Sequence, residues 1–215
     1  MTHSKKVWYA PNRFESYGEE EIKAVEQCLR DGWLAGFGPR SIEFEEKVAK
    51  YFGKKLGVFV NSGSSACLLA IAGLDLLKGC KIITPACTFA TTLAPIIQLG
   101  YKPIFCDVNL ISYVPDVKDV IKLVDDEVKA IMIPNLIGNK PDWKLLKEEL
   151  IRIGREDIYL IEDSADTIGY LVNGKNLGKL SPVRPFRIPQ DTAGHKENAV
   201  NFKVIKRDMR LKIDI

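Results

Sequence analysis

Three carboxylates follow the short apolar segment at residues 158–161: Glu162 and Asp163 are adjacent, and Asp166 comes three residues later. Acidic groups at the carboxyl end of a buried parallel strand lie where open α/β sheets bind ligands. A buried carboxylate is costly unless it is paired, and a protonated pyridine nitrogen would be a suitable partner for Asp163. The structural alternative is that Asp163 caps the following segment while Asp166 is a solvated loop acid.

A glycine-serine turn with the sequence NSGSSA spans residues 61–66, after the apolar run at residues 56–60. Gly63 would let the backbone approach a ligand closely, and Ser64 and Ser65 would offer donors where a helix dipole favours anions. The turn matches neither the dinucleotide fingerprint nor the P-loop. A serine helix cap without a ligand would explain the same residues. Together with the buried carboxylate, however, the turn suggests a phosphorylated cofactor that carries a basic nitrogen.

One aromatic residue, Phe89, follows the apolar run at residues 81–84. Its ring could stack on a planar group held between it and the sheet. An aromatic residue in the first turn of a helix more often packs in a core, so both interpretations stay open.

Regularly alternating elements would position these groups. Apolar periodicity predicts helices at residues 19–30 and 41–51, the second with Ser41 as its N-cap. Further strands are expected at 56–60, 81–84, 103–108, 128–133 and 158–162, and further helices at 64–77, 88–99, 116–124 and 143–153. Mostly apolar strands separated by helices predict an α/β fold, in which three αβα layers are built around a mostly parallel sheet.

Composition narrows the class of protein. The 215 residues carry a net charge of +3, which is too small to favour nucleic acid or a membrane surface as a partner. No apolar run approaches the ~20 residues of a membrane span, and the N-terminus does not resemble a secretion signal. The odd, scattered cysteines favour buried free thiols in a reducing cytoplasm. With His3 and His195 as the only histidines, we expect no metal site.

Several segments in this order resemble the DegT/StrS family of nucleotide-sugar aminotransferases over residues 11–181. They are GWLAGFGP at 32–39, FE at 44–45, NSGSSA at 61–66, PACTF at 85–89, NLIGN at 135–139 and EDSAD at 162–166. The resemblance implies the aspartate-aminotransferase (type I) fold and the cofactor pyridoxal 5′-phosphate (PLP). We therefore expect residues 1–181 to form the N-terminal part of a PLP-transferase large domain, left incomplete.

The same resemblance implies a role for each candidate residue. The serine pair would hold the PLP phosphate, the aromatic ring would stack on the pyridine, and Asp163 would pair with the ring nitrogen. Asp166 stands where many members carry glutamine near the ring hydroxyl, and aspartate there is more similar to the sugar 3-dehydratases. The implied cofactor-binding residues are Gly63, Ser64, Ser65, Phe89, Asp163 and Asp166.

Residues 182–215 depart from the family's pattern. The sequence PVRPF at 182–186 replaces the strand and turn that would carry the catalytic lysine, or histidine in some dehydratases. His195 and Lys196 lie at about the right distance but in sequence that does not match, and Lys175 and Lys179 are interpreted as solvated. We therefore expect a divergent, irregular tail, an unknown catalytic residue, and a truncated protein that lacks the Schiff-base lysine and is inactive alone.

The function that the resemblance implies is transamination or 3-dehydration of a nucleotide-linked 4-keto sugar. The family would place such a protein in the cytoplasm, as a homodimer that makes sugars for lipopolysaccharide or other cell-surface polysaccharides. The alternative hypothesis is a non-catalytic fragment that binds PLP weakly or pairs with a full-length homologous subunit. An unrelated α/β binding domain with accidental motifs is the third.

Overall fold

The computed structural model describes residues 18–32 and 38–167, and beyond them the backbone of four two-residue strands. The chain divides into two units, residues 1–43 with 208–215, and residues 44–207. In the first unit, helix α2 (Glu19–Arg30) has the predicted bounds. The N–H of Gly18 donates to the Glu21 carboxylate at 2.6 Å, and Gly32 adopts a φ of 75° just beyond the helix.

Helix α3 (Pro39–Tyr51) begins two residues earlier than the sequence predicts. Proline suits a first helical position because its φ is already helical and its missing N–H would have had no partner there. The predicted N-cap at Ser41 is therefore wrong, since Ser41 lies inside the first turn. At the other end, Gly53 has a φ of 62°, and the Lys54 N–H bonds back to the Ala49 carbonyl oxygen at 2.7 Å.

The strand expected at residues 56–60 does not form. This segment instead contacts α3: the Phe59 N–H donates to the Glu45 carboxylate at 2.7 Å, and the Phe59 and Phe44 rings meet edge-on at 5.1 Å. A side chain at Gly57 would meet the Glu45 carbonyl oxygen at 2.6 Å, so the close approach requires glycine there. The apolar run favours burial, but a strand also needs a neighbour that completes its hydrogen bonds.

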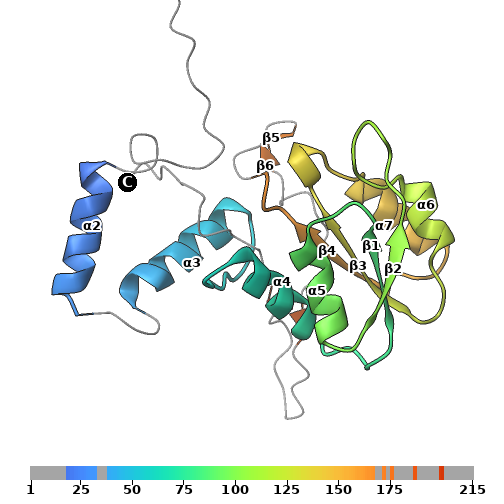
Figure 1. The fold of residues 1–215 in the computed structure, drawn as a ribbon, viewed down its shortest axis with the longest axis horizontal. Helices are drawn as coiled ribbons and strands as arrows, with labels where there is room; N and C mark the ends of the chain where they lie inside the picture. The colour runs from blue at the N-terminus through green and yellow to red at the C-terminus, as the bar shows by residue number, and fades with distance from the viewer. Residues whose placement is uncertain are drawn as a thin grey trace, which may run out of the picture. The chain divides into compact units, whose positions relative to one another are not determined.

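Among the described residues, four parallel strands form the central sheet of the second unit, in the order β2-β1-β3-β4 (Figure 1). They are β1 (Lys81–Pro85), β2 (Lys102–Cys106), β3 (Val128–Pro134) and β4 (Tyr159–Asp163). The register pairs Pro85 with Cys106 and Pro134 with Asp163, so neighbouring strands end together at one edge. The predicted α/β class with a parallel sheet is confirmed.

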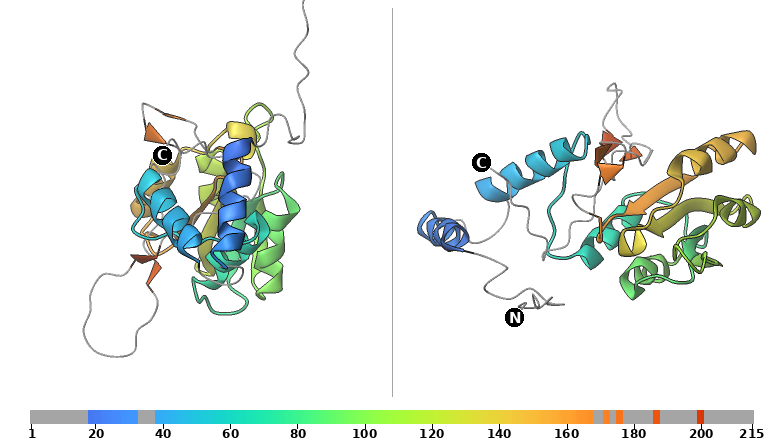
Figure 2. Two further views of the ribbon diagram at one scale, coloured as in Figure 1. Left: turned by 90° about the vertical axis from the view of Figure 1, so that its left-hand side faces the viewer. Right: turned by 90° about the horizontal axis from the view of Figure 1, so that it is seen from above.

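The connecting helices cover both faces of this sheet, as Figure 2 shows from two further directions. They are α4 (Gly63–Ala72), α5 (Ala90–Gln98), α6 (Val117–Lys122) and α7 (Trp143–Arg152). The helix expected at residues 64–77 is too long, because α4 ends before Gly73. Short antiparallel pairs lie later in the chain, β5 (Leu171–Val172) with β6 (Lys175–Asn176) and β7 (Phe186–Arg187) with β8 (Ala199–Val200).

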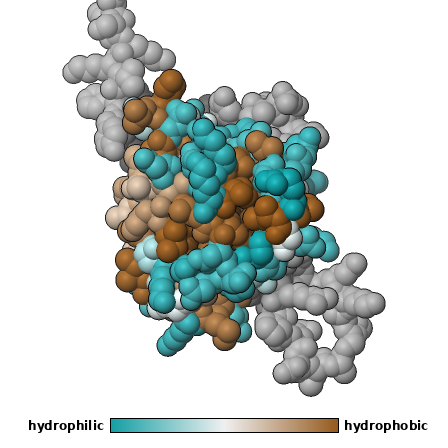
Figure 3. Space-filling view, turned by 90° about the vertical axis from the view of Figure 1, so that its right-hand side faces the viewer, coloured by the Kyte–Doolittle hydropathy of each residue, from teal (hydrophilic) through white to brown (hydrophobic). Residues whose placement is uncertain are grey.

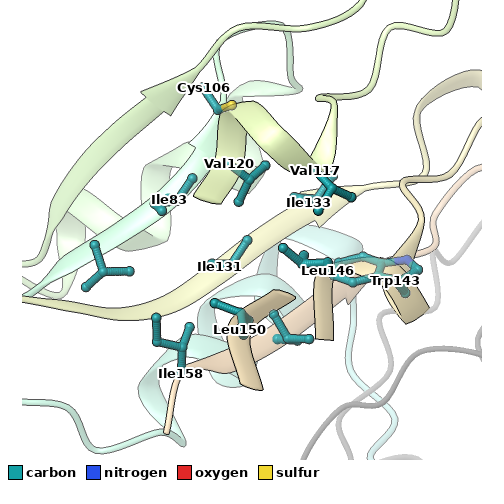
Figure 4. Packing of buried hydrophobic residues seen from close by; sticks show 12 residues of the cluster. Ile83, Cys106, Val117, Val120, Ile131, Ile133, Trp143, Leu146, Leu150 and Ile158 are labelled. Carbon is teal, nitrogen blue, oxygen red and sulfur yellow. The ribbon is translucent and has the colours of Figure 1, made fainter. Parts of the chain in front are cut away.

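Two apolar clusters hold the layers together. On one face, Cys67 and Ile71 of α4 and Ile96 of α5 pack against Ile82 and Met132. On the other face, α6 and α7 pack on β1, β3 and β4, and the cluster includes Ile131, Leu146 and Trp143 (Figure 4). Full burial of such side chains contributes about 1.5–3 kcal/mol each.

The surface of the protein is mixed in character. Figure 3 shows hydrophobic residues gathered between hydrophilic ones on one face. The cysteines are free, and only Cys67 and Cys106 are buried, so the expectation of buried thiols fails for the exposed Cys87. Within residues 18–32 and 38–167, every helix is too short or too polar to span a lipid bilayer.

Candidate functional site

Asp163 is the last residue of β4 and is almost fully buried, with 7% of its surface exposed. Alternation along the strand places it on the α4–α5 face, because Ile161 two residues earlier packs in that cluster. Its Oδ2 atom accepts a hydrogen bond from the Thr92 hydroxyl at 3.1 Å and lies 3.8 Å from the Cys67 Sγ atom. Its Oδ1 atom accepts the Ala165 N–H at 3.1 Å.

The hydrogen-bond donors that the structure gives to the buried Asp163 carboxyl group are all uncharged. Burial raises the pKa of its carboxyl group, and the charge of Asp166 raises it further, while the Ala165 and Thr92 donors lower it in part. Burial and the Asp163 charge also raise the pKa of the Cys67 thiol, so Cys67 stays protonated as a donor. Among residues 18–32 and 38–167, no lysine, arginine or histidine forms an ion pair with Asp163.

Glu162 is equally buried but faces the opposite side of the sheet, where Leu160 packs with α7. Its Oε1 atom accepts Asn135 Nδ2 at 2.6 Å and the Ser164 hydroxyl at 2.8 Å. Lys54 is also near: burial lowers the pKa of its ammonium group, and the Glu162 charge raises it in part. The sequence alone does not predict this cluster. The sequence feature that could have predicted it is Asn135, a polar residue that directly follows the buried strand β3 at the carboxyl edge of the sheet.

The serine turn caps α4 through Ser62, which precedes both of the predicted serines. Ser62 Oγ accepts the Ser65 N–H at 3.2 Å and donates its own proton to Ser65 Oγ at 3.1 Å. The cap therefore already uses the Ser65 amide. The N–H groups of Gly63 and Ser64 bond to no described residue, as is usual in the first turn of a helix. Those two amides and the hydroxyls around them are the donors that remain for an anion.

Phe89 directly precedes α5, and 64% of its surface is exposed, so the alternative that it packs in the core is wrong. The hydroxyls of Thr84 and Thr88, on either side of the loop that leads to Phe89, are buried and meet no hydrogen-bond partner within the described residues. Buried polar groups are nearly always paired in native proteins, so such orphans at a strand end point to a ligand or water.

Asp166 is exposed, yet it is more than a solvated acid. Its Oδ2 atom accepts the backbone N–H of Ile137 at 3.3 Å, from the loop that follows β3. The described site thus brings Asp163, Asp166 and Asn135 together at the carboxyl ends of β3 and β4. Lys175 is described only by its backbone, and Lys179, His195 and Lys196 lie outside the described residues.

A separate cavity of about 890 Å³ lies at the opposite edge of the sheet, where the strands begin. Its lining includes Lys78, Cys80 and Tyr159. Open parallel sheets bind their ligands outside the carboxyl ends of the strands, so this cavity is not the candidate active site.

A parallel αβα domain with a helix-capping serine turn, an exposed aromatic residue and a buried aspartate at its carboxyl edge is the kind of domain on which PLP-dependent aminotransferases are built. The chain belongs to the DegT/DnrJ/EryC1/StrS aminotransferase family, whose model matches residues 15–186. The resemblance seen in the sequence is thereby confirmed.

Characterised relatives agree with this family. The chain is 34% identical over 174 residues to GDP-4-keto-6-deoxy-D-mannose 3-dehydratase of Escherichia coli O55:H7, covering 78% of this chain and 44% of the relative. It is 31% identical over 166 residues to GDP-perosamine synthase of Vibrio cholerae, covering 77% of this chain and 44% of the relative. The chain thus spans less than half the length of these relatives.

Solved structures support the fold. The E. coli GDP-4-keto-6-deoxy-D-mannose-3-dehydratase with bound hydrated PLP superimposes with a TM-score of 0.69 at 33% identity, covering 79% of this chain and 43% of that one. A Streptococcus pneumoniae protein described as a putative sugar aminotransferase, in its PLP form, gives a TM-score of 0.73 at 24% identity, over 82% of this chain and 47% of that one. The expected type I fold of PLP-dependent aminotransferases is confirmed.

Proposed function

We propose that this chain provides the cofactor-binding part of a PLP-dependent enzyme that transaminates or 3-dehydrates a nucleotide-linked 4-keto sugar. The observation that carries the proposal is Asp163, a buried carboxylate with a raised pKa and no cationic partner among the described residues. A pyridinium nitrogen supplies such a cation in a planar group that also fits beside an exposed aromatic ring. The family and the relatives named above favour the same chemistry.

Each candidate residue has a part in this proposal. The amides of Gly63 and Ser64, with the hydroxyls of Ser64 and Ser65, would hold the phosphate at the start of α4. Phe89 would cover one face of the pyridine, and Asp163 would keep the ring nitrogen protonated. When bound, PLP supplies an electron sink that stabilises negative charge at the neighbouring carbon of its amine partner. Asp166 would act from the edge of this site.

The choice between the two reactions, and the sugar itself, belong to this proposal as well. Aspartate at position 166 favours the dehydratase branch, as does the 34% identity to a 3-dehydratase. We place the activity among cytoplasmic enzymes that make lipopolysaccharide sugars and act as homodimers.

The residue that would anchor the cofactor and transfer protons is not among the residues described above. We propose that residues 182–215 do not supply the lysine or histidine that anchors the cofactor, because the family match ends at residue 186. On this proposal the 215-residue chain binds PLP without a covalent bond and does not turn over substrate alone. A non-catalytic role, in which the fragment pairs with a full-length homologous subunit, remains the alternative function.

Titration with PLP, followed by visible absorbance, tests these statements. We expect saturable binding by the wild-type protein and much weaker binding by Asp163→Asn. Borohydride reduction and peptide mapping then ask whether any lysine holds the cofactor covalently. Covalent attachment at Lys196 would show that the proposed lack of an anchoring residue is wrong. Absence of PLP binding in the wild-type protein would remove the cofactor assignments altogether.

A further inference from the structure

The turn that follows β3 contains an unusual backbone conformation. Ile137, in the short helix η1 (Leu136–Gly138), has a φ of 54° and a ψ of 30°. This left-handed conformation is rare for any residue other than glycine and is a genuine outlier for a β-branched side chain. The Ile137 side chain is 72% exposed, so apolar packing does not explain the conformation. Strain of this kind persists only where surrounding contacts impose it.

One side chain, that of Asp166, contacts the backbone at this position. The Ile137 N–H donates to Asp166 Oδ2 at 3.3 Å, across 29 positions of sequence. The next amide, of Gly138, bonds only locally to the Asn135 carbonyl oxygen at 3.3 Å. Within the described chain, the Asp166 carboxylate is therefore the one side chain that accepts a hydrogen bond from the amides of Ile137 and Gly138.

The base of the same turn is joined to the end of β4. The Asn135 N–H donates to the Asp163 carbonyl oxygen at 2.8 Å, which continues the β3–β4 ladder. The Asn135 side chain binds Glu162 and reaches Ser164 at 3.1 Å. Movement of the turn would therefore be transmitted to the backbone that carries the Asp163 carboxylate.

We infer that Asp166 is a positioning residue, which holds the strained turn and through it the end of β4, and does not act by contact with the cofactor. This inference rests on the proposed function for its binding readout. It differs from the role that the family resemblance implies, in which Asp166 lies against the ring hydroxyl. In this inference, Asp166 affects the position of Asp163 through contacts with Ile137 and Asn135.

A double-mutant cycle separates the two roles. Asp166→Ala removes the acceptor, and Ile137→Gly removes the strain, because glycine adopts a positive φ freely. We expect Asp166→Ala to speed amide exchange at residues 137–138 about tenfold or more, as for loss of a hydrogen bond to a charged acceptor. It should also weaken PLP binding several-fold. The double variant Asp166→Ala/Ile137→Gly should recover most of the lost affinity, and Asp166→Asn, which keeps an acceptor oxygen, should retain it.

Glu156→Ala is the matched control, because it removes an exposed carboxylate that makes no hydrogen bond or ion pair in the described chain. It should change neither measurement. If the double variant binds PLP as weakly as Asp166→Ala, Asp166 contacts the cofactor directly and the inference is overturned. Unchanged amide exchange in Asp166→Ala would overturn it as well. Failure of the wild-type protein to bind PLP would count against the proposed function, whereas the exchange measurement, made without PLP, would still decide the inference.

Discussion

Glu162 and Asp163 are adjacent in sequence and equally buried, with 7% of each exposed, but they meet opposite surroundings. The Glu162 side chain lies on the α6–α7 face, where a single oxygen accepts an amide and a hydroxyl at 2.6 and 2.8 Å. The Asp163 side chain lies on the α4–α5 face, where its donors are longer, at 3.1 Å or more. Burial raises the pKa of the Asp163 carboxyl group.

The two adjacent carboxylates at the end of β4 therefore have different roles. Because a strand directs successive side chains to opposite faces, the pleat separates the two carboxylates. Glu162 is held in a polar cluster that joins β3 to β4, so its role is structural. Asp163 has no cationic partner among the described residues, so its carboxylate could pair with a positively charged ligand.

The largest expected effect on stability comes from the structural member of the pair. Glu162→Ala leaves the buried Asn135 amide with one good acceptor fewer and should lower the free energy of unfolding by about 2–3 kcal/mol. Urea unfolding without ligand measures this loss, with Glu156→Ala as a control that stays within about 0.5 kcal/mol of wild type. A loss no greater than that of the control would mean that Glu162 does not stabilise the strand ends.

Asp163→Asn should reduce cofactor binding and leave the stability of the unliganded protein unchanged or slightly higher. The neutral amide avoids the burial of a charge, so we expect the unliganded protein to be as stable as wild type or slightly more stable at neutral pH. PLP affinity should fall about tenfold to a hundredfold, because a charged hydrogen bond of about 1.5–3 kcal/mol is lost. Calorimetry and PLP titration measure the two quantities. Equal affinity in both proteins would remove the distinction between the two carboxylates.

The stability of the protein should also depend on pH through Asp163. Burial raises the pKa of Asp163 above its ordinary value of 3.8, so the folded protein holds this proton more tightly than the unfolded chain. The resulting stabilisation is fully present at pH values below 3.8 and is lost as the pH rises through the higher pKa of the folded protein. The unfolding free energy of wild type minus that of Asp163→Asn should therefore decrease with rising pH across this window. Urea unfolding of both proteins at several pH values measures it, and a difference that increased with pH would show that the carboxylate is already paired.

The smallest effect should come from the donor that Asp163 already has. Thr92→Val keeps the side-chain volume but removes the hydroxyl at 3.1 Å, which should raise the Asp163 pKa further. We expect a change in stability of about 0.5–1.5 kcal/mol, the usual value for one hydrogen bond, and a small loss of PLP affinity. Thr91→Val, next to it in α5, is the matched control. The two variants behaving alike would mean that Thr92 does not orient the carboxylate.

Much of the fold could be predicted from local patterns. The predicted strands at 81–84 and 128–133 and the predicted helix at 143–153 are confirmed, because each apolar pattern faces a layer that buries it. The segment at 56–60 has the same apolar character and forms no strand. A strand depends on a neighbour, which periodicity does not report.

The candidate site was predictable only in part. Asp163 and the serine turn stand out because their residue types interrupt apolar runs. The side chains that contact the Asp163 carboxylate do not stand out in the sequence. Thr92 and Cys67 lie 71 and 96 positions away from it along the chain. Nor does the sequence distinguish Ser62, which caps α4, from the serines that follow it.

The amino-acid sequence is sufficient to predict the family, the alternation of strands and helices, and the strand end at which acidic residues gather. Those properties follow from local composition and spacing. The packing of the layers, in contrast, determines that Glu162 accepts two short hydrogen bonds, whereas Asp163 accepts longer ones from Thr92 and Cys67. It also brings the Asp166 carboxylate to the Ile137 amide. The partners of a buried carboxylate depend on the donors that the packed layers bring to it, and these donors come from distant parts of the chain.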